Sequence, residues 1–457
     1  MPMMTLALAT ILAFTPPAPE TSALPDRLTV ENYVRPLIDA DLIPGGVVAL
    51  HARGATVFFG FGSTHLDRAS TPDEHTVYEI GSISKVLTGV LLAEAVRRGE
   101  VTFDTPVADL LPAGIAPPGT DDDPILLRHL VTHTSGLPRM PGNLIPVDLE
   151  APYSDYTADR LFAFLDGRFT ASAPGNRYEY SNLGSGLLGQ LLARKAELPY
   201  EQLLHERLCA PLGLQDTRCC TEDSSTRLAP PTAHGRITRP WANMAALSPA
   251  GAVRSTPADM LRFAVCQFNP PGSPLAETLA VAREPLHQNG AMQIACGWHI
   301  ARDGSLWWHN GQTGGYASYL GVVPEEHVAV VVLTNGSAGE VTTVGMQLVD
   351  LMLGKAPEPL TLEPARPIDP QRLAALEGRY QAPGGFVLEV RAFNDRLFAR
   401  GGGQPWFRYD PADNDRFRAR GPAVELQFNE TEPTPAPAVT IHQGGRATTL
   451  GRIDETP

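Results

Sequence analysis

The chain has 457 residues, and its 36 Lys and Arg against 50 Asp and Glu give a formal net charge of −14. This length allows more than one domain and a substantial core. The acidic balance, without any basic run, argues against nucleic acid as a partner, and no stretch approaches the roughly 20 apolar residues of a stable membrane span.

The N-terminus has the pattern of an export signal. Thr5 to Phe14 is a short apolar run, and a Pro-rich stretch leads to Thr21-Ser22-Ala23, whose small side chains suit cleavage. No Lys or Arg precedes the run, so only the α-amino group supplies positive charge. We expect residues 1–23 to be a signal peptide and the protein to be periplasmic or secreted. The alternative is a disordered or mis-started N-terminus.

The first predicted elements are a helix over residues 30–40 and two strands. The strands are Gly45–His51 and Thr56–Gly60, joined by a turn at Arg53-Gly54. A helix follows that begins near Ser82, where Gly81 suits a sharp entry. Its apolar residues recur at helical spacing and give it a face to bury: Val86, Leu87, Val90, Leu91, Ala95 and Val96.

Ser82 and Lys85 lie three residues apart at the start of this helix, so their side chains share a face. Only three of the 36 basic residues are Lys, namely Lys85, Lys195 and Lys355. A desolvated lysine can become a neutral base, whereas arginine keeps its proton. Ser-x-x-Lys also occurs by chance on surface helices, so the pair needs partners before it indicates an activated nucleophile.

The middle of the chain is mainly helical, and the end of this part changes to strands. Residues 140–156 are predicted to form a long loop, a candidate wall for a pocket. Thr256 with Pro257 predicts a helix start. The other predicted elements are helices at Leu126–His133, Asn182–Lys195, Tyr200–Cys209 and Val341–Met352, and strands at Ile294–Ile300, Leu306–His309, Tyr316–Val322 and Val328–Leu333.

Strands at both ends with helices between them predict an α/β domain with a mixed, antiparallel sheet flanked by helices and a helical subdomain, over residues 24–354. A Pro-rich linker is expected at 355–369. Short alternating strands then predict a small all-β barrel or sandwich at 370–457.

Two later motifs could complete a site around Ser82. Tyr180-Ser181-Asn182 lies at a loop-to-helix junction, where Asn182 can cap the helix and Tyr180 can relay a proton or ionise beside a lysine. His309-Asn310-Gly311-Gln312 follows a strand, and its glycine permits close backbone approach to a substrate. Taken singly, the first motif could be a helix cap beside a packed tyrosine, and the second a glycine-rich hairpin.

The cysteines give no metal site and no disulfide framework. The five residues are Cys209, Cys219, Cys220, Cys266 and Cys296, without a CxxC pair, and the chain lacks HExxH. A bridge from Cys209 to Cys219 or Cys220 can form outside the cytoplasm, although buried free thiols are the favoured interpretation.

The ordered set Ser82-x-x-Lys85, Tyr180-x-Asn182 and His309-x-Gly311 resembles the serine β-lactamase and penicillin-binding protein family, nearest to the class C β-lactamase-related hydrolases. The resemblance covers roughly residues 25–353. Neighbouring stretches are also similar to ones that recur in the family, among them Leu130–Pro138 and Gly314-Gly315-Tyr316. The C-terminal region resembles the small β-barrel that some members carry.

The resemblance implies a role for each motif residue. Ser82 would be the acylated nucleophile, and Lys85 would be its base or the partner that lowers the pKa of Tyr180. Asn182 would orient Lys85 and the substrate amide. The N–H groups of Ser82 and Gln312 would form the oxyanion hole, with His309 and Gly311 on the substrate-binding strand. No cofactor or metal would be required.

One departure affects the expected substrate. β-Lactamases of this class usually carry Lys-Thr-Gly where this chain has His309-Asn310-Gly311, so a fixed cation is replaced by a group that is neutral over much of the physiological range. We therefore expect a serine hydrolase for small esters or D-amino-acyl peptides. The alternatives are a β-lactamase, a D-Ala-D-Ala carboxypeptidase, and a penicillin-binding or scaffold protein without turnover. The sequence does not determine the oligomeric state.

Overall fold

The computed structural model describes residues 24–453, apart from residues 67, 121, 167–172, 220–225, 234, 242, 269–271, 394, 403, 405, 414–415, 421 and 430–434. The predicted signal peptide at 1–23 and Cys220 lie outside the described residues. Within them, Cys209 carries a free thiol, so the bridge to Cys219 is not formed. No described helix is long and apolar enough to cross a bilayer.

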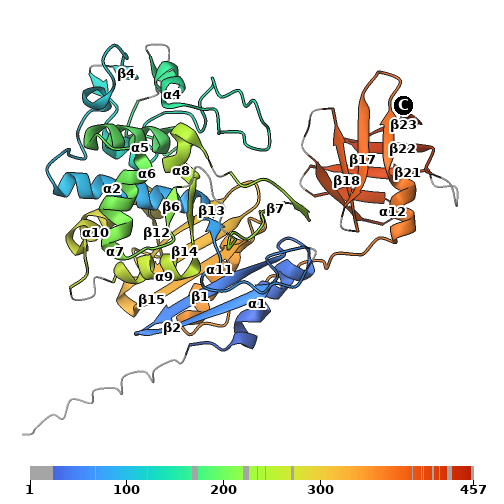
Figure 1. Ribbon diagram of the computed structural model, residues 1–457, viewed down its shortest axis with the longest axis horizontal. Helices are drawn as coiled ribbons and strands as arrows, with labels where there is room; N and C mark the ends of the chain where they lie inside the picture. The colour runs from blue at the N-terminus through green and yellow to red at the C-terminus, as the bar shows by residue number, and fades with distance from the viewer. Residues whose placement is uncertain are drawn as a thin grey trace, which may run out of the picture.

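Residues 24–354 form the larger part of the structure, and an eight-stranded antiparallel sheet lies at its centre. The strand order is β10-β11-β12-β13-β14-β15-β1-β2 (Figure 1). β1 (Gly45–Ala52) pairs with β15 (Val328–Thr334), so early and late segments share one sheet, which confirms the predicted fold class. The remaining strands are β2 (Ala55–Gly62), β10 (His287–Asn289), β11 (Met292–Ile294), β12 (His299–Ala301), β13 (Leu306–Gln312) and β14 (Ala317–Val323).

Helices cover both faces of this sheet. Because strand side chains alternate between faces, Val48 and Leu50 of β1 pack into one core with α1 (Arg27–Asp39) and α11 (Val341–Met352). Val47 and Ala49 face the opposite core, which contains the other helices of the larger part.

The helix that carries Lys85 is buried on all sides, and not on one face as predicted. α2 (Ser84–Arg97) follows the short 3₁₀ helix η1 (Gly81–Ile83), and every residue of α2 from Ser84 to Ala95 is buried. A helix that is buried on all sides lies in the middle of a core, and the polar residues of α2, such as Lys85, are buried with it.

The helical layer fits the prediction in outline, with local differences. The helix predicted to reach His133 ends earlier, because His133 has a φ of +60°. A helix at Ala158–Leu165 was not predicted. The bounds are α3 (Leu127–Val131), α4 (Ala158–Leu165), α5 (Asn182–Ala196), α6 (Tyr200–Leu204), the π-helix η3 (His205–Cys209), α7 (Ala210–Leu212), α8 (Ser248–Gly251), α9 (Pro257–Cys266) and α10 (Ala276–Arg283), with 3₁₀ turns at Val107–Leu110, Ala245–Leu247 and Pro324–Glu326.

Two predictions at element ends can be compared directly. Thr256 caps α9 as predicted, accepting a hydrogen bond from Asp259 N. The cap of α5 is Ser181, and not Asn182, because the Ser181 side chain accepts the hydrogen bond from Gly184 N.

The strand predicted at Ile294–Ile300 is wrong. The chain turns at Gly297, which has a φ of +76°, and β11 and β12 pair with each other on either side of it. A Cβ on Gly297 would lie 2.5 Å from the carbonyl oxygen of Lys85, so this turn sits directly against the start of α2.

Short strands complete the larger part in three small sheets. β3 (Tyr78–Glu79), β9 (Val253–Ser255) and β6 (Arg218–Cys219) form one of them. The other two are the pairs β4 (Gly119–Thr120) with β5 (Asp123–Pro124) and β7 (Thr232–Ala233) with β8 (Arg236–Ile237).

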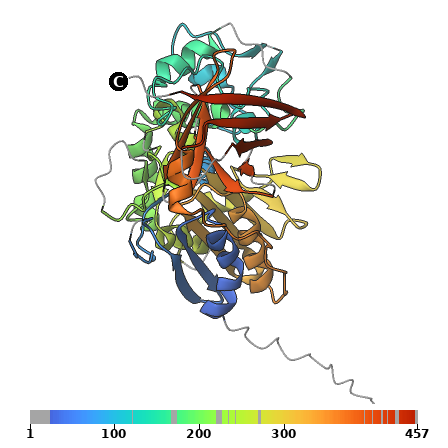
Figure 2. The same cartoon turned by 90° about the vertical axis from the view of Figure 1, so that its right-hand side faces the viewer.

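A closed eight-stranded barrel follows α12 (Pro370–Leu376), which confirms the predicted all-β C-terminal part. Consecutive strands pair antiparallel and β16 closes on β23, so no sheet edge is left unpaired. The strands are β16 (Gly378–Gln381), β17 (Val387–Phe393), β18 (Arg396–Gly401), β19 (Phe407–Pro411), β20 (Arg416–Ala419), β21 (Val424–Phe428), β22 (Ala438–Gln443) and β23 (Arg446–Ile453). The barrel lies in front of the larger part in Figure 2.

Candidate active site

Ser82 and Lys85 meet at the junction of η1 and α2. Lys85 Nζ donates to Ser82 Oγ over 3.0 Å and to the carbonyl oxygen of Ala250, in α8, over 2.6 Å. Ser82 is partly exposed, whereas Lys85 is buried. A nucleophile that a substrate can reach is therefore hydrogen-bonded to an amine that solvent does not reach.

The surroundings of Lys85 favour its neutral form. Burial lowers the pKa of Lys85 well below its ordinary value, and the positive charge of Arg139 lowers it further. A neutral amine 3.0 Å from a hydroxyl can accept its proton as that oxygen attacks a carbonyl carbon.

Tyr180 brings a second hydroxyl to Ser82. The Ser82 hydroxyl is near enough to lower the pKa of Tyr180, and the Tyr180 ring lies 4.9 Å from Lys85 Nζ and 5.2 Å from Arg139 Cζ. Burial raises the pKa of Tyr180 in spite of the opposing effect of the Ser82 hydroxyl. The environment thus favours a neutral phenol that passes a proton on, and works against the alternative in which Lys85 makes Tyr180 ionise.

Glycines bring β13 against the segment that carries Ser82. Gly81 has a φ of +52°, and a Cβ on it would lie 2.6 Å from Gln312 N. A Cβ on Gly311 would lie 1.9 Å from the carbonyl oxygen of Ile80, which also accepts a hydrogen bond from Ser318. The backbone N–H of Gln312 is therefore next to the Gly81–Ser82 peptide, as two oxyanion donors would have to be.

Other hydrogen bonds hold the Ser82 turn in place. Ser84 Oγ donates to the carbonyl oxygen of Gly81 over 2.7 Å and accepts from Val253 N over 3.1 Å. Just before this turn in the sequence, the buried carboxylate of Glu79 pairs with Arg254 at 3.4 Å. A locked turn keeps the nucleophile pre-oriented, which is the geometric condition for efficient attack.

Asn182 is not placed as expected. Its amide donates to Met140 Sδ over 3.3 Å, while the two acceptors of Lys85 Nζ among the described residues are Ser82 and Ala250. The carbonyl oxygen of Ala250 thus takes the part in holding Lys85 that was expected of Asn182. Asn182 remains half-buried beside Tyr180.

His309 is a neutral group in a cluster of aromatic rings. Its ring stacks on His299 with centroids 4.7 Å apart and lies 6.3 Å from Tyr180. Burial lowers the pKa of His309 well below its ordinary value, and the charges of His299 and Lys85 act in the same direction. Its Nε2 has no hydrogen-bond partner among the described residues. His309 therefore brings to the site a buried nitrogen without a partner in the described part of the chain, and no fixed charge.

The sequence analysis did not identify three residues that lie around the site, namely Arg139, His299 and Tyr178. His299 accepts from or donates to the Tyr178 hydroxyl at 3.3 Å. Tyr178 lies two residues before Tyr180, so an extended backbone would have placed both side chains on one face. No pattern marked His299 or Arg139. Within the described part of the chain, no group of His, Cys, Asp and Glu is placed to hold a metal ion.

We predict that Arg139→Gln moves the acid limb of the kcat/KM profile to higher pH. Arg139 helps to keep the pKa of Lys85 low, so its removal raises that pKa, and the neutral amine is then lost at a higher pH as the pH falls. Ester hydrolysis measured across the pH range tests this, with the exposed Arg194→Gln as a matched control. An acid limb that stays in place or moves to lower pH contradicts it.

We also predict that His299 makes the fold sensitive to acid. Burial lowers the pKa of His299 to about 4 from 6.5, so the unfolded chain binds more protons between these values. Stability is then lost as the pH falls from 6.5 towards 4. From pH 7 to pH 5 the wild type should lose about 2 kcal/mol more unfolding free energy than His299→Phe. Denaturant titrations at both pH values measure the difference, and equal losses would refute it.

The sequence profile of the Beta-lactamase family matches residues 30–350. A beta-lactamase of Yersinia enterocolitica is 27% identical over 368 residues, covering 72% of this chain and 92% of the relative. The D-alanyl-D-alanine-carboxypeptidase/endopeptidase AmpH of Escherichia coli (strain K12) is 32% identical over 210 residues, covering 45% of this chain and 53% of the relative.

Solved structures give the same result for the fold. The octameric penicillin-binding protein homologue from Pyrococcus abyssi aligns with a TM-score of 0.63 at 22% identity, covering 93% of this chain and 100% of the other. This alignment spans both the larger part and most of the barrel.

Proposed function

The chain belongs to the beta-lactamase family of serine hydrolases, and from this premise we propose that Ser82 is its acylated nucleophile, Lys85 the base and Tyr180 the proton relay. The observation that carries the proposal is the hydrogen bond of 3.0 Å from the buried Lys85 amine to Ser82 Oγ, with the Tyr180 ring 4.9 Å from the same amine.

In the proposed reaction, Ser82 Oγ attacks the carbonyl carbon as its proton passes to neutral Lys85. The oxyanion that forms accepts hydrogen bonds from the N–H groups of Ser82 and Gln312. Collapse of this intermediate breaks the bond to the leaving group, and Tyr180 relays the proton from Lys85 to the departing oxygen or nitrogen. Water then attacks the carbonyl carbon of the acyl-enzyme, and Lys85 and Tyr180 pass its proton to Ser82 Oγ. The acid is released and Ser82 is restored.

The proposed substrates are small esters or D-amino-acyl peptides. The residue at the third motif, His309, is buried and neutral, so it provides no cation for the carboxylate of a β-lactam. A relative is named as a D-alanyl-D-alanine carboxypeptidase/endopeptidase, which agrees with peptide substrates. β-Lactam hydrolysis is the second candidate, since other relatives are named beta-lactamases. Asn182, His309, Gly311 and Gln312 are proposed to contact the substrate.

Two covalent probes test the proposal. A fluorophosphonate and a fluorescent penicillin are incubated with the purified protein, with Ser82→Ala, and with the exposed Ser305→Ala as a matched control. We expect labelling by the phosphonate that Ser82→Ala abolishes and Ser305→Ala keeps. Penicillin labelling with slow release indicates a carboxypeptidase, and rapid penicillin turnover a β-lactamase. Absence of labelling by either probe would indicate a scaffold without turnover and overturn the proposal.

We further propose that the chain is organised as a signal peptide at 1–23, a hydrolase domain at 24–354, a linker at 355–369 and a barrel domain at 370–457. The polar backbone of the linker is held in part by α1, since Ala365 N donates to the carbonyl oxygen of Asp39 and Tyr33 Oη to that of Pro357. Export to the periplasm or the medium follows from the proposed signal peptide, and N-terminal sequencing of the protein from whole cells tests it.

A further inference from the structure

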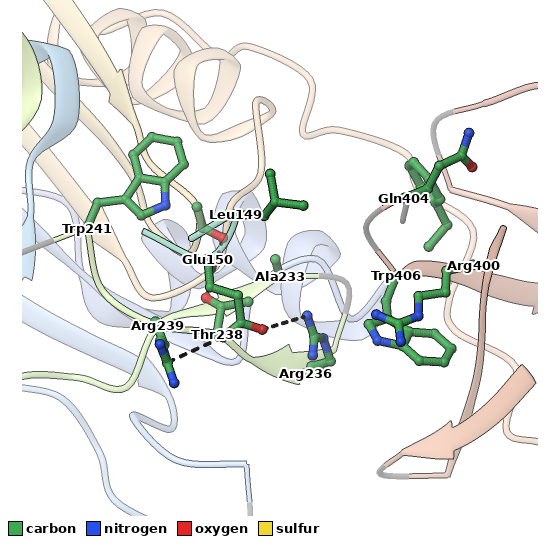
Figure 3. Close-up of a pocket in the computed structure, with 12 residues that line it drawn as sticks. Leu149, Glu150, Ala233, Arg236, Thr238, Arg239, Trp241, Arg400, Gln404 and Trp406 are labelled. Carbon is green, nitrogen blue, oxygen red and sulfur yellow. Dashed lines mark hydrogen bonds and ion pairs between the residues drawn. The ribbon is translucent and has the colours of Figure 1, made fainter. Parts of the chain in front are cut away.

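A cavity of about 520 Å³ lies between the larger part, which carries the catalytic residues, and the barrel (Figure 3). Its catalytic side is formed by Leu149 and Glu150 of the long loop, by the β7–β8 hairpin, and by Trp241. Its other side is formed by the barrel residues Arg400, Gln404, Trp406 and Phe407. The cavity is separate in sequence from every motif that the reaction uses, but it includes Gly314.

Gly314 connects this cavity to the reacting centre. It follows Gln312 by two residues, so the two backbones are at most about 7 Å apart along the chain. A Cβ on Gly314 would lie 2.6 Å from Trp241 Nε1, which means that the Trp241 indole packs directly on this glycine. A substrate whose carbonyl lies at Gln312 N–H therefore has Trp241 within reach of any extended substituent.

Ion pairs and hydrogen bonds fix the barrel on the larger part. The carboxylate of Asp41, at the end of α1, accepts from Arg396 Nε of the barrel over 2.7 Å. Arg408, fully buried, donates to the carbonyl oxygen of Asp41 over 3.4 Å, and Arg420 donates to that of Ala40 over 2.7 Å. Three arginines of the barrel thus bind one turn of the larger part. They hold the two walls of the cavity at a defined separation.

The side chains that line the cavity are complementary to an aromatic group that carries a carboxylate. Trp241 and Trp406 face the cavity from opposite sides and provide flat apolar surface. Arg236, Arg239 and Arg400 provide guanidinium groups against one lining carboxylate, Glu150. The ion pairs from Arg236 and Arg239 to Glu150, from Arg239 to Asp148, and from Arg400 to Glu389 occupy only some of the five N–H donors that each guanidinium carries.

The cavity continues into the mouth of the barrel. A second cavity of about 360 Å³ shares Arg400, Gln404 and Phe407 with the first and is lined further in by apolar side chains such as Leu388 and Ile441. Arg400 thus lies at the boundary between the two cavities, with its guanidinium 4.6 Å from the centre of the Trp406 ring.

We propose that the barrel supplies a substrate subsite, in which Arg400 and Trp406 bind an aromatic arm that ends in a carboxylate. Trp241 contacts the part of the arm next to the reacting carbonyl, Trp406 the aromatic ring, and Arg400 with Arg236 the carboxylate. This subsite deepens the proposed function and rests on it, because the arm has to extend from a carbonyl group at Ser82. It gives the barrel, which carries none of the catalytic residues, a role in selecting the substrate.

Four esters test the subsite. p-Nitrophenyl acetate has no arm, and the p-nitrophenyl ester of 4-(4-carboxyphenyl)butanoic acid has the carboxylate arm on its acyl side. The matching carboxamide removes only the charge, and 4-(4-carboxyphenyl)butyl acetate places the arm on the leaving group. For the carboxylate ester that the subsite accepts, we expect kcat/KM divided by that of p-nitrophenyl acetate to fall about tenfold in Arg400→Ala and in Arg236→Ala, whereas the same ratio for the carboxamide ester responds only to Trp406→Ala.

Matched controls are Arg446→Ala and Phe393→Ala, on exposed barrel positions that do not line the cavity. Arg236 lies on the short β7–β8 hairpin outside the barrel, so its variant is expected to fold even if Arg400→Ala does not. Titration of Ser82→Ala with 4-(4-carboxyphenyl)butanoate gives a readout without turnover. Binding lost in Arg236→Ala or Arg400→Ala supports the subsite even if no ester is hydrolysed, a result that would contradict only the proposed reaction. Hydrolysis without arm preference, together with no binding, overturns the subsite.

Discussion

Lys85→Met is expected to lower the rate of fluorophosphonate labelling and of ester hydrolysis about a thousandfold while leaving the fold intact. The Lys85 amine is the group placed to accept the Ser82 proton, at 3.0 Å, and general-base catalysis of this kind contributes roughly a hundred- to ten-thousandfold. Methionine has a similar length and no charge, so it fills the same buried space. We expect the unfolding free energy to change by no more than about 2 kcal/mol, since the loss of a donor to Ala250 is offset by the loss of a buried amine.

Lys85→Arg separates proton transfer from charge. Arginine keeps a positive charge and several donors but does not release its proton, so it is expected to be as inactive as the methionine variant. Lys195 is exposed, and Lys195→Met is the matched control. Initial rates with both probes, alongside thermal unfolding, measure the effect. Activity in Lys85→Arg close to that of the wild type would mean that the cation, and not the base, is what Ser82 needs.

The parts of this site that could be predicted from sequence are those set by local geometry. Ser82 and Lys85 are three residues apart at a helix start, and that spacing alone brings the two side chains together. The close approach of β13 was also predictable in kind, because the glycine of His309-Asn310-Gly311 marks a place where another backbone has to lie near. The prediction of a closed barrel depended likewise on a local feature, the period-2 alternation of short strands.

What the sequence could not show depends on contacts between distant segments. The carbonyl oxygen that holds Lys85 belongs to Ala250, a residue whose side chain takes no part and whose position 165 residues away carries no pattern. The all-round burial of α2 was missed for a similar reason, since the number of elements packed around a helix is a property of the whole fold. Gly297 broke a predicted strand because it lies against the backbone of Lys85, and nothing in its own neighbours indicates that contact.

The cavity lined by Trp241 and Trp406 is the clearest case of this limit. The two indoles lie 165 positions apart in the sequence and belong to different parts of the chain. The barrel strands predicted a fold but no function, because the function proposed for Arg400 arises only when Arg396, Arg408 and Arg420 dock on the turn after α1.

Gly311→Ala is expected to lower kcat about a hundredfold or more, through the backbone alone. A Cβ at this position would lie 1.9 Å from the carbonyl oxygen of Ile80 and 2.5 Å from Ser318 Oγ, far inside van der Waals contact. β13 has to move away from the Ser82 turn by more than an ångström, and the N–H of Gln312 moves with it. Loss of one oxyanion donor costs about a hundred- to a thousandfold in kcat, and overpacking of this kind costs about 1–3 kcal/mol of stability.

Gly451→Ala is the matched control, because Gly451 also lies in a strand, β23, and has nothing within 4 Å of an added Cβ. The decisive measurement is the separation of kcat from KM at a temperature well below the unfolding midpoint of Gly311→Ala. A displaced oxyanion donor acts on the transition state, so kcat falls while KM stays within a few-fold. If Gly311→Ala kept the kcat of the wild type, the N–H of Gln312 would have no part in the reaction, and the oxyanion would have to be stabilised from elsewhere in the site.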